Sequence, residues 1–144
     1  MIRKSIQLLS STGTNWEITG NSIPGNSYYG YSAGIHTVQV IYQNFVGGFG
    51  IQGTLSLNPT DTDWFWIQLN SASNTGTPYI TFPINILAPT GKNGGDTGSA
   101  AFTFVGNFVY LRAMLVRSYI GPAPTEPAWQ NWVHGQIDTA LLSM

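Results

Sequence analysis

Apolar and polar residues alternate with a period of two along most of the chain, and this alternation most strongly limits the possible folds. Successive side chains of a β-strand point to opposite faces, so the pattern predicts strands buried on one face. The expected strands, bounded by Gly, Pro, Asn and Asp, are residues 3–9, 14–19, 35–46, 49–57, 63–70, 78–86, 99–105, 107–117 and 134–142. A chain of 144 residues with this pattern predicts one all-β domain over residues 1–144, an antiparallel β-sandwich of jelly-roll type rather than a barrel.

Two short glycine-containing breaks predict tight hairpins. Gly47 and Gly48 separate two alternating arms, and Gly106 and Asn107 separate two more. Two-residue hairpin loops need positive φ, which glycine adopts without steric cost. We therefore expect the strands on either side of each break to pair with one another.

The segment at residues 64–69 (WFWIQL) has bulky side chains on both faces of a predicted strand. Such a strand is either central and covered on both sides, or buried on one face and in contact with a partner through the other. Both alternatives predict low exposure, and the second makes Trp64 and Trp66 candidate interface residues.

Charged residues are scarce, at 8% of the chain, against about 25% in an ordinary soluble domain. The net charge of -1 provides no field that attracts polyanions, so we expect no nucleic-acid or membrane partner. A surface with so few charges tends to associate, which favours a protein whose faces are covered in an assembly. The absence of cysteine excludes disulfides, thiolate nucleophiles and cysteine-based zinc sites.

A loop at residues 20–34, rich in Gly, Ser and Asn, contains Tyr28, Tyr29 and Tyr31. Tyrosine in such loops provides contact area at low entropic cost, so these residues are candidates for binding a protein or a carbohydrate. The alternative is that the rings cover one end of the sandwich. Residues 88–98 and 121–127 are also expected to be loops.

The last part of the chain, residues 121–144, is a candidate docking arm. Three prolines between residues 121 and 127 favour an extended chain, and Trp129 and Trp132 follow as possible anchors for a neighbouring groove. The strand at residues 134–142 could then add to the sheet of another subunit. In the alternative, it completes the sandwich of its own chain.

The acidic and imidazole side chains do not form a recognisable catalytic or metal motif. No pair of carboxylates is flanked by a cleft-forming pattern, and no G-x-S-x-G motif is present. His36 and His134 are expected to be hydrogen-bonded residues at a strand edge or interface. Asn58, Asp61 and Asp63 could offer oxygen ligands to calcium, with Asp96 as a remote fourth ligand, but a turn that satisfies its own backbone is favoured. We therefore expect no enzymatic activity, no metal and no cofactor.

Residues 13–69 and 95–115 resemble small structural proteins of tailed bacteriophages, particularly those of marine and cyanobacterial myoviruses. The resemblance implies a β-rich virion component, such as a head decoration, neck or tail accessory protein, with itself and other virion proteins as partners. Such a protein is made in the host cytoplasm and needs no signal peptide, and the sequence shows none. The alternative function is a carbohydrate-binding sandwich, either freestanding or as a phage adhesin.

Overall fold

The computed structural model describes residues 5–12, 15–30, 34–69, 79–84, 87–91, 94–120 and 134–144 of the chain. Within these ranges the chain forms two antiparallel sheets, as the alternation predicts. The strands are β1 (Ser5–Ser10), β2 (Ile18–Thr19), β3 (Ile23–Pro24), β4 (Ile35–Phe45), β5 (Gly47–Thr54), β6 (Phe65–Ile67), β7 (Ile80–Phe82), β8 (Asp96–Val105), β9 (Tyr110–Val116) and β10 (Gln136–Ser143). A 3-10 turn, η1 (Asp61–Asp63), precedes β6.

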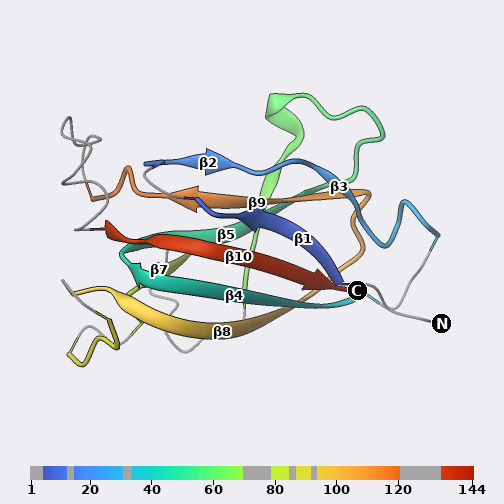
Figure 1. Ribbon diagram of the computed structural model, residues 1–144. Helices are drawn as coiled ribbons and strands as arrows, with labels where there is room; N and C mark the ends of the chain where they lie inside the picture. Colours follow the sequence, from blue (N-terminus) through green and yellow to red (C-terminus); the bar gives the residue numbers. More distant parts are fainter. Residues whose placement is uncertain are drawn as a thin grey trace.

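The two sheets stack face to face as a sandwich (Figure 1). The first, sheet A, has the strand order β1-β10-β4-β8. The second, sheet B, has the order β2-β9-β5-β6, with β3 paired to β9 and β7 paired to β5. The expected all-β, antiparallel sandwich is confirmed.

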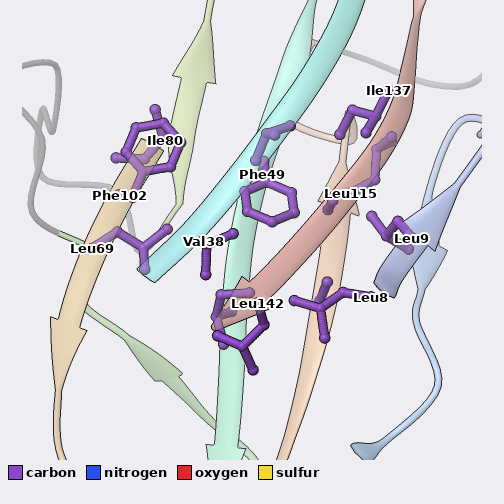
Figure 2. Packing of buried hydrophobic residues seen from close by; sticks show 14 of the residues in the cluster. Leu8, Leu9, Val38, Phe49, Leu69, Ile80, Phe102, Leu115, Ile137 and Leu142 are labelled. Atoms are coloured by element: carbon purple, nitrogen blue, oxygen red, sulfur yellow. The ribbon is translucent and has the colours of Figure 1, made fainter. Parts of the chain in front are cut away.

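The core lies between the sheets and is built from the inward-facing half of each alternating strand. Figure 2 shows Val38 and Leu142 from sheet A meeting Phe49 and Leu115 from sheet B. All four side chains are almost completely buried. At about 25 cal/mol per Å² of apolar surface removed from water, this core is the main source of stability.

The predicted hairpin at Gly47-Gly48 is wrong. The strand before it, β4, belongs to sheet A, and the strand after it, β5, belongs to sheet B, so the chain changes sheets at Val46. The crossing is held by partners distant in sequence: the N–H of Val46 donates to the carbonyl of His134 (2.9 Å), and Arg117 Nε donates to the carbonyl of Val46 (2.8 Å). Gly47 has a φ of 156°, so the glycine is needed for the change of direction between layers.

The predicted hairpin at Gly106-Asn107 is wrong for the same reason, because β8 lies in sheet A and β9 in sheet B. The N–H of Gly106 donates to the carbonyl of Gly34 (2.9 Å). The buried side chain of Asn26 accepts a hydrogen bond from the N–H of Phe108 (2.9 Å) and donates to the Asn107 side chain. The chain therefore changes sheets at both positions, across the single residue Val46 at the first and across residues 106–109 at the second.

The last strand is not a docking arm. β10 lies inside sheet A, paired to β1 on one side and to β4 on the other. Its inward residues Ile137, Ala140 and Leu142 are fully buried, so this segment completes the sandwich of its own chain. The preceding part of the proposed arm, residues 121–133, lies outside the described residues.

Two loop expectations need smaller corrections. The loop at residues 20–34 contains the short strand β3, whose Ile23 and Pro24 pair with β9. The loop at residues 88–98 ends early, because β8 begins at Asp96. Pairing partners far along the chain add these residues to the sheets, which local turn signals do not reveal.

A buried arginine joins three segments at one end of the sandwich. Arg117 follows β9 and is 1% exposed. Its guanidinium donates to four backbone carbonyls, those of Asn15 (3.0 Å), Val46 (2.8 Å), His134 (2.7 Å) and Gly135 (2.9 Å). Burial lowers its pKa to about 10, and the nearby Tyr119 acts in the opposite direction. The side chain therefore ties the β1–β2 connection, the sheet crossing and the start of β10 together.

Candidate functional site: an aromatic outer face

The outward-facing side of sheet B has a band of aromatic side chains, which we call the aromatic face. It comprises Tyr28, Tyr29, Trp64, Trp66, Tyr79, Tyr110 and Tyr119. These residues come from the β3–β4 loop, β6 and its approach, the approach to β7, β9 and the turn after β9. Sheet B brings them together although they are far apart in sequence.

Glycines in β5 create the space for the larger rings. A Cβ atom on Gly50 would lie 2.7 Å from Cζ3 of Trp66, and one on Gly48 would overlap the ring of Tyr79. The rings therefore lie directly on the backbone of β5. This explains why every residue of this strand is buried, although one of its faces points away from the core.

The rings of Trp66, Tyr79 and Tyr119, at one end of the band, contact each other at an angle. Trp66 and Tyr79 have centroids 5.7 Å apart and an interplanar angle of 57°, and Tyr79 and Tyr119 are 5.6 Å apart at 35°. Burial raises the pKa of Tyr119 to about 12, with Tyr79 adding to the effect and Arg117 opposing it. The Tyr119 hydroxyl is therefore neutral at physiological pH.

A polar pair lies in the middle of the band. Arg112 on β9 donates from Nε to Oε1 of Gln52 on β5 (2.8 Å). The Arg112 guanidinium carbon lies 4.2 Å from the centre of the Trp64 ring, a cation–π contact. Burial lowers the pKa of Arg112, while Asp61 acts in the opposite direction. The aromatic face thus includes one cation whose position is set by a stacked ring and an amide.

The tyrosine loop extends the band at its other end. Tyr28 and Tyr29 are exposed, and their rings meet edge to face with centroids 5.3 Å apart. Tyr28 also lies 5.6 Å from Tyr110. The loop is tethered by the buried Asn26, so these rings project from a fixed base. Of the alternatives for this loop, the exposure of Tyr28 and Tyr29 favours a contact surface.

The predicted site residues divide into two groups. Tyr28, Tyr29, Trp64 and Trp66 lie on the aromatic face, whereas Tyr31, Trp129 and Trp132 lie outside the described residues. The low exposure expected for the segment at residues 64–69 is wrong for Phe65, which is 43% exposed, and for Gln68, which is also exposed. β6 is an edge strand with β5 as its neighbour. The central strand covered on both faces is β5.

Sequence reasoning missed Tyr79, Tyr110, Tyr119 and Arg112. The alternation along β9 could have identified Tyr110 and Arg112, because both occupy outward positions of a strand whose burial alternates regularly. Tyr79 and Tyr119 lie beside strand ends, where no periodicity indicates the face they cover.

Three of the described acidic residues accept hydrogen bonds from backbone N–H groups. Asp63 Oδ2 accepts from the N–H of Thr60 (2.7 Å), which closes the turn expected at residues 58–63. The buried Asp96 accepts from the N–H groups of Ile84 (2.7 Å) and Thr90 (3.2 Å). Glu17 accepts from the N–H of Ser118 (3.2 Å). Within the described residues, His, Asp and Glu form no group of three that could hold a metal ion.

Both histidines are buried rather than at an edge or interface, which corrects the expectation for them. His36 lies on β4, a central strand, and its ring stacks on Phe104 with centroids 4.5 Å apart. His134 packs edge-on against Trp16 at 4.8 Å. Burial lowers the pKa of His134, and Arg117 adds to this effect.

The part of the chain that the structure describes includes no helix long and apolar enough to cross a bilayer. Comparisons of the chain with known protein families, with curated proteins and with solved structures found no match.

Proposed function

We propose that this chain is a non-enzymatic structural protein of a bacteriophage particle that acts by self-assembly and by contacts with other virion proteins. The observation that supports this most directly is the aromatic face, where Trp and Tyr rings contact one another and Arg112 stacks on Trp64. Trp, Tyr and Arg are the residue types most enriched at the energetic centres of protein–protein interfaces. A position in the capsid decoration, the neck or the tail fits this role.

The angles between the rings favour a protein partner over a sugar. A sugar-binding platform needs two or three coplanar, open rings beside polar groups. On the aromatic face the neighbouring pairs are tilted by 57° for Trp66 and Tyr79 and by 85° for Tyr28 and Tyr29. A carbohydrate-binding module or phage adhesin is therefore the second candidate.

The strand order supports the jelly-roll assignment on which the proposal also depends. The strands β1, β10, β4 and β8 form one sheet and β2, β9, β5 and β6 the other, so the chain repeatedly changes layers. Jelly rolls are common in viral capsid proteins and in lectins. This is an analogy at the level of the fold, and the aromatic face decides between the two classes.

Purified particles of the phage that encodes the chain provide the direct test. Quantitative mass spectrometry should find the protein in the particles at a fixed copy number relative to the major capsid or tail protein. Its absence from particles, combined with binding of the purified protein to a glycan array, would overturn the proposal in favour of the adhesin-like module.

Variants of the tyrosine loop test the face itself. The double substitution Tyr28→Ser and Tyr29→Ser should reduce binding of added protein to particles that lack it by at least about thirtyfold, because the loss of even one hot-spot ring costs about 2 kcal/mol or more. The double substitution Leu55→Ser and Leu57→Ser is the matched control, since both leucines are exposed apolar residues in a different loop. Equal binding of the two variants would show that the tyrosines are not part of the interface.

A further inference from the structure

The outward-facing side of sheet A, which we call the flat face, differs from the aromatic face in its chemistry. Pairing across the four strands aligns its residues in rows. The central row is Gln7, Leu141, Gln39 and Ala101, and the rows on either side are Ser5, Ser143, Thr37 and Thr103, and Ser10, Thr139, Ile41 and Ser99. None of these residues is charged. Gln7 Nε2 donates to Thr139 Oγ1 (3.0 Å) along the surface of the face.

The two ends of the flat face have complementary shapes. At one end Ile35 and Val105 are directly paired on β4 and β8 and are 54% and 74% exposed. At the other end, where β4 and β10 have irregular register, lies an open depression of about 480 Å³. Its lining includes Ile41, Gln43, Thr97, Gly98, Ser99 and Asp138.

We infer that a second copy of this chain packs on the flat face about a two-fold axis that runs along the central row, perpendicular to the strands. This dimer would be one of the contacts through which the chain assembles, so the inference rests on the proposed assembly function. The axis exchanges the two ends of the face, so Ile35 and Val105 of each copy enter the depression of the other. On β4, Ile35 and Gln43 are equally distant from Gln39, and on β8, Val105 and Thr97 are equally distant from Ala101.

The chemistry of the rows suits an identical partner. Hydroxyl and amide groups both donate and accept hydrogen bonds, so Gln7 and Gln39 of the central row can bond the central row of the second copy. The two flanking rows face each other across the axis, so their Ser and Thr residues can bond one another in the same way. A charged row would instead place like charges opposite each other at a two-fold axis. In Figure 1 no described segment crosses in front of β1, β10, β4 and β8.

The area is sufficient for a weak, symmetric contact. With a strand spacing of about 4.8 Å and a rise of about 3.4 Å per residue, the flat face covers about 500 Å². Two copies then bury about 1,000 Å² in total, which is close to the lower limit for specific interfaces. We therefore expect a reversible dimer that becomes stable when other contacts of an assembly hold the copies together.

Sedimentation equilibrium over about 5–500 µM tests the contact, a range that suits interfaces of this size. The wild-type chain should show a monomer–dimer equilibrium. Ala101→Lys places two ammonium groups near the axis and should raise the dimer Kd at least tenfold. Leu57→Lys, an exposed apolar residue outside the sheets, is the matched control and should leave the Kd within twofold. A monomeric wild type, or equal Kd values for the two variants, would overturn the inference.

Two opposite substitutions at one position test the orientation. In the inferred packing Ile35 lies in the depression near Asp138 of the second copy. Ile35→Glu should therefore weaken the dimer more than Ile35→Lys, and adding Asp138→Lys should restore the dimer of the Ile35→Glu variant. Equal effects without rescue would exclude this packing. Circular dichroism spectra and melting curves verify that each variant is folded.

The test of dimerisation and the test of the proposed function can give different results. If the chain is found in particles but does not dimerise through the flat face, the inference fails and the assembly role stands. If it dimerises but is absent from particles, the inference stands and the virion role fails.

Discussion

Replacing Arg117 by Met should destabilise the protein far more than the loss of a partly exposed arginine would. The guanidinium is 1% exposed and donates to the carbonyls of Asn15, Val46, His134 and Gly135. Methionine has similar length and no donor, so these carbonyls lose the hydrogen bonds from the guanidinium, and of the four the His134 carbonyl still accepts from the N–H of Val46. A buried polar group that loses its partner costs about 1–3 kcal/mol.

Removing the charge offsets part of this loss. Burial lowers the pKa of Arg117 to about 10, and this shift corresponds to a cost of about 3 kcal/mol for holding the charged form in the folded state. The carbonyls together lose more than this, because several of them are orphaned at once. We expect a net destabilisation of about 3–5 kcal/mol, the range for breaking one side of a buried charged network.

Urea denaturation followed by tryptophan fluorescence measures the effect. The midpoint should fall without a change in slope, and Tm should fall by about 10–15 °C, given about 2–4 °C per kcal/mol for a chain of this size. Arg117→Lys should retain part of the stability, because an ammonium group has three donors but cannot reach all the carbonyls.

Arg112→Met is the matched control for this experiment. Arg112 is partly exposed, and its hydrogen bond to Gln52 and its stacking on Trp64 are worth about 1 kcal/mol together. Equal stability losses for Arg117→Met and Arg112→Met, or an Arg117→Met variant as stable as the wild type, would refute the reasoning.

The remaining predictions concern single side chains and solution conditions. Asp96→Asn turns an amide donor toward the N–H groups of Ile84 or Thr90 and should cost about 1–3 kcal/mol in urea denaturation, whereas an unchanged midpoint would contradict the assigned hydrogen bonds. The pKa of His134 is lowered in the folded state, so the unfolded chain binds the proton more tightly and stability should fall as the pH decreases below about 6.5. Between pH 7 and 5, His134→Gln should reduce this fall in Tm, and parallel curves for the two proteins would show that another group is responsible. The turn at residues 60–63 satisfies its own backbone, so melting curves in EDTA and in calcium should coincide, and a large calcium-dependent rise in Tm would reveal a metal site.

Local sequence patterns predicted the strands well because alternation is a property of neighbouring residues. The predicted strand at residues 107–117 became β9, with every second side chain buried, and the one at residues 35–46 became β4. The scarcity of charge likewise appears directly as a face of sheet A whose central rows contain none. The turn at residues 58–63 was also predictable, since Thr60 and Asp63 are close in sequence.

Strand partners were not predictable in the same way. Gly47 and Gly106 look like hairpin turns, yet each marks a change of sheet, because hydrogen bonds from His134, Arg117 and Gly34 hold the crossings. The alternation of apolar and polar residues shows which residues share a face of a strand. It does not show which other strand lies beside that strand. That choice depends on contacts between distant segments.

The candidate site shows the same division. The sequence alone identified Tyr28, Tyr29, Trp64 and Trp66 as residues suited to binding, because their chemistry and local context are visible in one dimension. They lie on one surface with Tyr79, Tyr110, Tyr119 and Arg112 only because β5 pairs with β6, β7 and β9. This pairing brings residues from five parts of the chain together. The role of Arg117 in joining three segments also depends on tertiary packing, since its carbonyl partners lie up to 102 residues away in the sequence.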